Sequence, residues 1–205
     1  VVVFGSTGQT GQHVVGLLVA EGHAVTAFAR NPAKVNTYNK AKVRIIQGDG
    51  RNSADVASAV KGQDAVIAAF GPRSLKKDDI QEVFIKNVIN AMNQYNLKRF
   101  IELSAWGAGD SLKRSKIPFK IVRKTILKNV FDDKDRGEAL IANSNLDYTN
   151  VRPGRLTNRP AQGNVRTSLS GRDLSASIAR ADVASFMVGQ LEDSSWLRKS
   201  PLIGY

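Results

Sequence analysis

Short apolar runs alternate along the chain with longer amphipathic segments. The apolar runs occupy residues 1–4, 24–29, 43–47, 64–70 and 99–103, and each is followed by a glycine or a polar residue. Between them, apolar residues at helical spacing predict helices over residues 12–21, 55–61 and 79–96. This alternation is typical of a parallel sheet covered on both faces. It predicts an α/β fold, a Rossmann-type doubly wound parallel sheet, in a single domain over residues 1–205 with a small C-terminal substrate-side region.

Three glycines spaced by two residues follow the first apolar run. Gly5 would let the chain reverse, Gly8 would let a pyrophosphate approach the backbone, and Gly11 would let the helix pack closely on the strand. The free N–H groups and partial positive charge of a helix N-terminus attract phosphate. The pattern predicts a dinucleotide site, with an ordinary strand-to-helix turn as the alternative. The residues assigned to cofactor binding here are Gly5, Thr7, Gly8, Gln9, Thr10 and Gly11.

The second and third apolar runs end in residues that suit a nucleotide, and ligands of open parallel sheets bind beyond the carboxyl ends of the strands. Arg30 follows the second run with no acidic residue nearby. A guanidinium pairs well with a 2′-phosphate, so the sequence favours NADP over NAD, unless Arg30 is a plain surface arginine. Asp49 follows the third run, where it would accept a hydrogen bond from the adenine amino group or simply form a turn.

The later runs add candidates for the reacting end of the cofactor. Phe70 and Gly71 end the fourth run and are expected beside the cofactor, with residues 72–73 starting a loop over it. Ser104 ends the fifth run, where its hydroxyl would donate to a substrate carbonyl or to the nicotinamide, or would only cap the next segment. Pro153, after the sixth strand, is assigned to the cofactor as well, and Trp106 would form an apolar wall of the pocket.

Composition narrows the classes of function. The chain has 42% hydrophobic and 23% charged residues, as in ordinary globular proteins, and with no cysteine and two histidines it has no thiolate or multi-histidine metal site. No apolar run is long enough for a membrane span, so a cytoplasmic location is expected.

The net charge of +12 is densest over residues 113–128, which would form a basic rim for an anionic substrate or a solvated helix face. Nucleic acid is an unlikely main partner, because aromatic residues are not interleaved with the basic ones.

Several of these motifs together resemble the atypical short-chain dehydrogenase/reductases. The resemblance covers nearly the whole chain and is strongest to the NAD(P)H-binding, NmrA-like group that includes biliverdin-IXβ reductase, also called flavin reductase. It implies a Rossmann fold, an NADP cofactor and hydride transfer to an acceptor. The stretches that carry it are residues 5–11, 28–30, 47–49, 62–67, 103–105, 150–154 and 180–184.

The chain departs from the usual catalytic pair of these enzymes, a Tyr-x-x-x-Lys motif in which the lysine lowers the pKa of the tyrosine. Alignment with the family places Lys134 at the lysine position and Val130 at the tyrosine position. The catalytic candidates implied are therefore Ser104 and Lys134, although Lys134 would otherwise belong to a solvated charge cluster. Without the tyrosine, the proton is expected from solvent after hydride transfer.

The sequence thus predicts an NADPH-dependent oxidoreductase that reduces flavins, biliverdin-like tetrapyrroles, quinones or other conjugated acceptors, acting as a monomer or weak homo-oligomer. Stacking of a planar acceptor on the nicotinamide would supply most of the positioning. Two alternatives stay open. One is a non-enzymatic, NADP-sensing regulator of the NmrA-like type, and the other is an interaction protein that uses the positive charge to bind nucleic acid.

Overall fold

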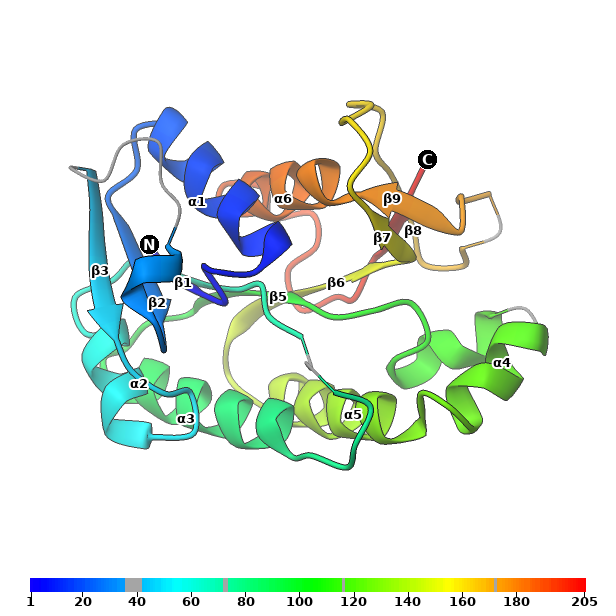
Figure 1. The fold of residues 1–205 in the computed structure, drawn as a ribbon, viewed down its shortest axis with the longest axis horizontal. Coiled ribbons are helices and arrows are strands. Elements are labelled where there is room, and N and C mark those ends of the chain that lie inside the picture. The colour runs from blue at the N-terminus through cyan, green and yellow to red at the C-terminus, as the bar shows by residue number, and fades with distance from the viewer. Residues whose placement is uncertain (36–41, 72–73, 116, 172) are drawn as a thin grey trace.

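One twisted sheet runs through the centre of the protein, in a computed structural model that describes residues 1–35, 42–71, 74–115, 117–171 and 173–205 (Figure 1). Its strand order is β3-β2-β1-β4-β5-β6-β10-β8, and every neighbouring pair is parallel except β10 and β8. A separate parallel pair joins β7 and β9. The strands are β1 (Val2–Phe4), β2 (Val25–Ala29), β3 (Val43–Gln47), β4 (Ala65–Ala68), β5 (Arg99–Leu103), β6 (Asp147–Pro153), β7 (Arg155–Thr157), β8 (Arg166–Ser168), β9 (Ser177–Ala179) and β10 (Leu202–Gly204).

Helices cover both faces of the sheet. Figure 1 shows α1 and α6 above it, α2, α3 and α5 below it, and α4 at one end of the molecule. The helices are α1 (Gln9–Ala20), α2 (Ser53–Val60), α3 (Ile80–Gln94), α4 (Ile117–Lys124), α5 (Lys128–Ala142) and α6 (Arg180–Gly189), with short 3₁₀ turns η1 (Pro32–Lys34) and η3 (Gly109–Arg114).

The two helical layers bury two separate apolar cores against the sheet. Along β1, Val1 and Val3 face the core under α1 and α6, whereas Val2 and Phe4 face the core under α2 and α3. Because successive strand residues point to opposite faces, a strand buried on both faces must be apolar at every position. This explains the uninterrupted apolar runs of the sequence.

The predicted doubly wound α/β fold is confirmed, with differences at the ends of the elements. The second helix begins at Ser53 rather than 55, because the Asn52 side chain accepts hydrogen bonds from the Ala54 and Asp55 amides. The first helix begins at Gln9 rather than 12, directly after the glycine turn. The fourth strand spans only Ala65–Ala68, inside the expected 64–70.

The C-terminal region was expected as a small substrate-side addition, and part of it instead extends the sheet. β10 pairs in parallel with β6, and β8 runs antiparallel on its outer side.

The strand order of the sheet reverses between β1 and β4. From β1 the chain continues to β2 and β3 on one side, and it then crosses to β4 on the other side. In sheets of this kind a ligand crevice forms at that point, beyond the carboxyl ends of the strands.

Candidate functional site

The glycine turn after β1 is packed too tightly for side chains at two of its three glycines. Gly5 has φ +78°, and a Cβ there would lie 2.7 Å from the Ala69 carbonyl oxygen. A Cβ on Gly11 would lie 2.1 Å from the Gly5 carbonyl oxygen, inside the backbone of the turn. These two glycines therefore hold β1, α1 and the end of β4 together.

Gly8 differs from its neighbours because it is exposed and caps α1. Its φ is −77°, and its own amide donates to the Gly5 carbonyl at 2.8 Å. As a glycine it has no side chain that could accept a hydrogen bond from the first amides of the helix. The amides of Gln9, Thr10 and Gly11 have no backbone acceptor within the described ranges. An exposed helix N-terminus with free amides and no covering side chain is the arrangement that binds phosphate.

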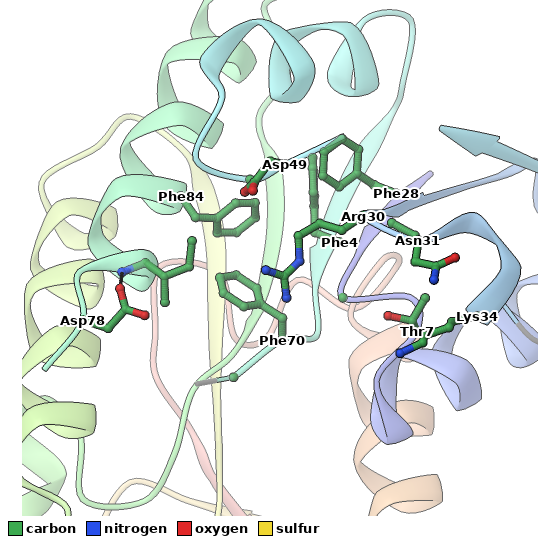
Figure 2. A pocket seen from close by; sticks show the side chains of 15 residues that line it. Phe4, Thr7, Phe28, Arg30, Asn31, Lys34, Asp49, Phe70, Asp78 and Phe84 are labelled. Carbon is green, nitrogen blue, oxygen red and sulfur yellow. Dashed lines mark hydrogen bonds between the residues drawn. The ribbon is translucent and has the colours of Figure 1, made fainter. Parts of the chain in front are cut away.

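A cavity of about 260 Å³ opens beside this turn, at the carboxyl ends of β1, β2 and β4 (Figure 2). Six of the predicted site residues line it, so the structure brings these six together around one cavity. They are Gly5, Thr7, Arg30, Asp49, Phe70 and Gly71. Figure 2 shows the Arg30 side chain extending into the cavity toward Phe70.

The end of β2 supplies the positive charge of this cavity. Arg30 is exposed and, with Lys34, makes no ion pair to any residue that the structure describes. The Asn31 side chain accepts from the Ala33 amide at 3.1 Å and so starts the 3₁₀ turn η1 that carries Lys34. Two cations at the rim of a cavity favour an anionic ligand.

Four phenylalanines form an aromatic wall that sequence reasoning identified only at Phe70. The rings of Phe70 and Phe84 lie 4.5 Å apart edge to face, and Phe4 lies 5.0 Å from Phe84 and 4.8 Å from Phe28. Their spacing in the sequence predicts buried core positions, so no local signal separated them from the rest of the core. Flat apolar rings beside a charged rim suit a ligand that carries both an aromatic ring and phosphate.

Asp49 is fixed by the loop in which it lies. Its amide donates to Asp55 at 2.9 Å, and its Oδ1 accepts from the Arg51 amide at 3.0 Å. The carboxylate therefore has a defined orientation at the cavity lining, with Oδ2 left for a ligand donor.

The remaining predicted residues lie outside this cavity. Ser104 and Pro153 end β5 and β6 at the same edge of the sheet, and the Pro153 carbonyl accepts from the Trp106 amide at 2.8 Å. Gln9 is exposed on the first turn of α1, and Thr10 is buried beside it. The expected loop start at Pro72 and Arg73, and Lys116 of the basic segment, fall outside the described residues.

Ser104 belongs to a buried network of charges. Its hydroxyl donates to Glu138 Oε1 at 2.5 Å, so the proton that was expected to reach a substrate is directed at a carboxylate. Arg152 grips the same carboxylate with two nitrogens, at 3.1 and 2.6 Å, and also contacts Asp110 at 2.6 Å. The Glu138 and Arg152 side chains are 6% and 5% exposed, which makes this a fully buried ion pair.

Lys134 is buried, which excludes the solvated charge cluster as its setting. It is 6% exposed, and its Nζ donates to the carbonyl of Leu103, directly before Ser104. The acidic residues around it in the sequence serve other contacts: Asp133 accepts from the amides of Gln81 and Glu82 and so caps α3. Lys134 therefore supports the end of β5 from below.

Glu102, on β5, is the buried acid that sequence reasoning missed. It is 1% exposed, accepts from the Gln81 side chain at 2.5 Å, and its Oε2 has no partner within the described ranges. Burial raises the pKa of Glu102 to about 7, and the nearby charge of Lys134 acts in the opposite direction. A protonated carboxyl turns the unpartnered oxygen into a donor, which suits a site that also holds the unpartnered Gln81 Oε1.

This acid makes stability depend on pH. The folded protein keeps the proton up to about pH 7, whereas the unfolded chain releases it near 4.5, so this group contributes stability at low pH that is lost between those values. The glutamine of Glu102→Gln is neutral at every pH in this range. The free energy of unfolding of this variant should therefore rise relative to that of the unmodified protein, by about 2 to 3 kcal/mol as the pH is raised from 5 to 8. Urea titrations at both pH values measure the difference, and a difference that does not change with pH would contradict a raised pKa.

Residues 5–194 match the model of one protein family, whose description is NAD(P)H-binding. The chain belongs to this NAD(P)H-binding family. The residues present fit such a cofactor. Arg30, Lys34 and an aromatic wall line one cavity, and the exposed amides at the start of α1, beside Gly8, lie next to it. Membership explains why a turn of glycines lies at the switch point of the sheet.

Relatives and solved structures extend over nearly the whole chain. An uncharacterised chloroplastic protein of Arabidopsis thaliana is 31% identical over 96% of this chain and 74% of its own length. The oxidoreductase YlbE of Lactococcus lactis is 26% identical with a TM-score of 0.84, covering 99% of this chain and 89% of that one. ChuY of Escherichia coli O157:H7, an anaerobilin reductase, has a TM-score of 0.84 at 21% identity over 99% of this chain and 95% of its own, and so shares the fold.

Proposed function

We propose that this member of the NAD(P)H-binding family is an NADPH-dependent oxidoreductase that reduces flavins, biliverdin-like tetrapyrroles or similar conjugated acceptors. The observation that carries the proposal is Arg30, which extends into the cavity from the end of β2 without an ion-pair partner among the described residues. NAD-specific sites place an acid at this strand end to accept from the ribose 2′-hydroxyl, whereas a guanidinium complements a 2′-phosphate.

The residues of the cavity divide the work of holding the cofactor. The amides at the start of α1 and the bare backbone of Gly8 would take the pyrophosphate, and Arg30 with Lys34 the 2′-phosphate. Asp49 would accept from the adenine amino group. Gly71, exposed at the end of β4, leaves room beside the cofactor, and a Cβ there would meet no atom within 4 Å.

Bound NADPH would supply a hydride, and this chain's residues would orient the two reactants. Ser104 and Pro153 lie at the sheet edge one and two strands beyond β4, on the side expected for the nicotinamide. Because the Ser104 hydroxyl donates its hydrogen bond to Glu138, we assign Ser104 Oγ to accept from the nicotinamide amide or from an N–H of the acceptor. This refines the role expected from the sequence, in which Ser104 was a donor.

Proton supply would come from solvent. The tyrosine position of the related enzymes is Val130. Of the three tyrosines in the described ranges, Tyr205 donates to Asp182, Tyr148 is buried in β6, and Tyr95 caps the C-terminal end of α3. Reduction of a flavin or another conjugated acceptor leaves a delocalised anion, which needs no dedicated acid to form. A planar acceptor is therefore the substrate class that this arrangement serves best.

The direct test is NADPH oxidation with FMN, biliverdin or a quinone as the acceptor. We expect turnover with at least one of them, and hydride transfer from deuterated NADPH should place deuterium on the acceptor. Tight NADPH binding without oxidation in the presence of any acceptor would overturn the proposal and favour the NADP-sensing regulator.

Arg30 should set the choice of cofactor. We expect the unmodified protein to bind NADPH at least about tenfold more tightly than NADH, and Arg30→Ala to lose about 1.5 to 3 kcal/mol of NADPH affinity with little change for NADH. Isothermal titration with both cofactors measures this. Arg44→Ala removes an exposed arginine of β3 that does not line the cavity and serves as the control. Equal affinities in the unmodified protein would contradict the assignment.

Ser104 and Lys134 should differ in their effects on turnover. Ser104→Ala should lower kcat/KM for FMN more than Lys134→Met does, because the lysine supports the β5 backbone and transfers no proton. We expect the Lys134→Met loss to stay below about tenfold, less than general acid catalysis contributes. Stopped-flow NADPH oxidation is the measurement, after NADPH affinity is shown to be retained. A loss confined to the lysine variant would make Lys134 the acid.

A further inference from the structure

The helix α4 presents its aliphatic side chains to the outside. Ile117 is 73% exposed, Ile121 60% and Val122 38%, and Ile126 in the turn after the helix is 61% exposed. Aliphatic residues on a surface helix ordinarily face the core, and isolated exposed ones are common, but four within ten positions form a patch. We call these four residues the α4 face.

Specific contacts hold the helix in this orientation. On its inner side, Phe119 packs edge to face on Phe131 with ring centres 6.0 Å apart. Arg123 is 6% exposed, donates to Asp132 at 2.9 Å and to Asp135, and lies 5.4 Å above the Phe131 ring. A helix that buries its arginine and exposes its isoleucines has the reverse of the usual pattern. The contacts of Arg123 with Asp132, Asp135 and Phe131 fix which side of α4 faces inward, and so they hold the apolar side outward.

Four lysines lie close to the α4 face in the sequence. Lys120 and Lys124 lie on the helix beside Ile121, Lys113 precedes it, and Lys128 follows it. Lys128 pairs with Asp132, and the Nζ of Lys120 donates to the Lys113 carbonyl, while Lys113 and Lys124 make no ion pair to any residue in the described ranges. The net charge of the whole chain is +12, so this surface adds apolar contact to a strongly cationic field.

We propose that the α4 face docks on an anionic lipid surface, with the isoleucines entering the headgroup boundary and the lysines beside the lipid phosphates. Aliphatic side chains with lysines close by are typical of interfacial helices, which lie in the membrane plane. A second copy would bring two cationic faces together, and nucleic acid would require stacking aromatic residues, of which the α4 face has none. None of the helices in the described part of the chain is long and apolar enough to span a bilayer.

The position of α4 leaves the cofactor site free. Figure 1 places α4 at one end of the long axis of the molecule and β2 and β3, which border the cavity, toward the other end. Docking through α4 therefore does not require the nucleotide to leave, and the inference is independent of which acceptor the protein reduces.

Sedimentation with vesicles tests the proposal. We expect the full chain to bind vesicles of phosphatidylcholine with one third phosphatidylserine at least about tenfold more tightly than pure phosphatidylcholine vesicles, and the binding to weaken as salt rises from about 0.1 to 0.5 M. Ile117→Ser/Ile121→Ser should reduce binding to the anionic vesicles at least about tenfold. Ile45→Ser/Leu169→Ser, at exposed aliphatic residues elsewhere, should bind as the unmodified protein does.

A charge series gives a second, independent measurement. Lys120→Gln/Lys124→Gln should weaken anionic-vesicle binding by about fivefold or more, since each lysine near an anionic surface adds to the attraction. Lys61→Gln/Lys86→Gln removes the same charge from other elements and should change it little. Unchanged binding in both α4 variants, equal affinity for the two vesicle types, or a concentration-dependent dimer that the α4 variants abolish would each overturn the proposal. Circular dichroism and NADPH affinity verify that each variant is folded.

Discussion

Gly8→Val should lose NADPH binding while the apo protein keeps its fold. Gly8 is exposed, and its φ of −77° is one that valine adopts readily, so the backbone itself tolerates the change. A Cβ there would lie 3.2 Å from the Gly5 carbonyl oxygen, a contact that a shift of a few tenths of an ångström relieves. The valine methyl groups would then occupy the approach to the free amides of α1. With two or more charge-assisted hydrogen bonds lost, affinity should fall at least about a hundredfold.

The controls for this experiment come from the same helix. Gly16→Val changes a glycine of α1 that has no atom within 4 Å of an added Cβ, so it measures the effect of valine on the helix alone. Gly11→Val is unsuitable, because a Cβ at that position collides with the Gly5 backbone and would disrupt the turn. Cofactor affinity is measured by titration, and folding by circular dichroism and the melting temperature. Retained affinity in Gly8→Val would mean that the glycine turn does not hold the pyrophosphate.

The sequence predicted the parts of the fold that local patterns encode. Apolar runs, helical spacing and the glycine pattern each involve residues that are close together in the sequence. The parallel sheet and the glycine turn could therefore be predicted from local sequence alone. Arg30, Asp49 and Phe70 line one cavity because each lies just beyond the end of a strand, and topology gathers strand ends at one edge. The three-residue strands β8 and β10 are too short to show any alternation, and β10 is placed by its pairing with β6.

The candidate site was less predictable wherever its contacts join distant segments. Phe84 reaches the cavity from α3, yet its helical spacing is that of any core residue. Glu102 and Gln81 are 21 positions apart, and Arg152 and Glu138 are 14 apart, with no motif linking them. Lys134 lay in an acidic stretch that suggested solvent, but helix packing turned it inward toward the Leu103 carbonyl. Partner identity in such a network depends on tertiary packing, which periodicity does not specify.

The Glu138 and Arg152 pair should be the most sensitive point of the stability of the fold. Arg152 comes from β6 and Glu138 from α5, so the pair joins the sheet to the helix that covers it. A Cβ on Gly109 would lie 2.6 Å from Arg152 Nη2 and 2.7 Å from Glu138 Oε2, which shows how closely the backbone encloses the pair. Removing Arg152 leaves the Glu138 carboxylate buried without a cation, and removing Glu138 leaves Arg152 with only its contact to the exposed Asp110. Either loss costs far more than the net contribution of an intact pair.

We therefore expect Glu138→Gln and Arg152→Met each to lower the free energy of unfolding by about 3 to 5 kcal/mol. The double variant should lose at least about 2 kcal/mol less than the sum of the single losses, because neither of the two buried charges remains. Guanidinium chloride titrations of the four proteins measure the coupling. Arg51→Met breaks only the exposed pairs with Asp78 and Asp79 and should cost no more than about 1 kcal/mol. Additive losses in the double variant would mean that Glu138 and Arg152 do not stabilise the fold as a coupled pair. Because Ser104 donates to the same carboxylate, that result would also mean that the ion pair does not set the orientation of the Ser104 hydroxyl.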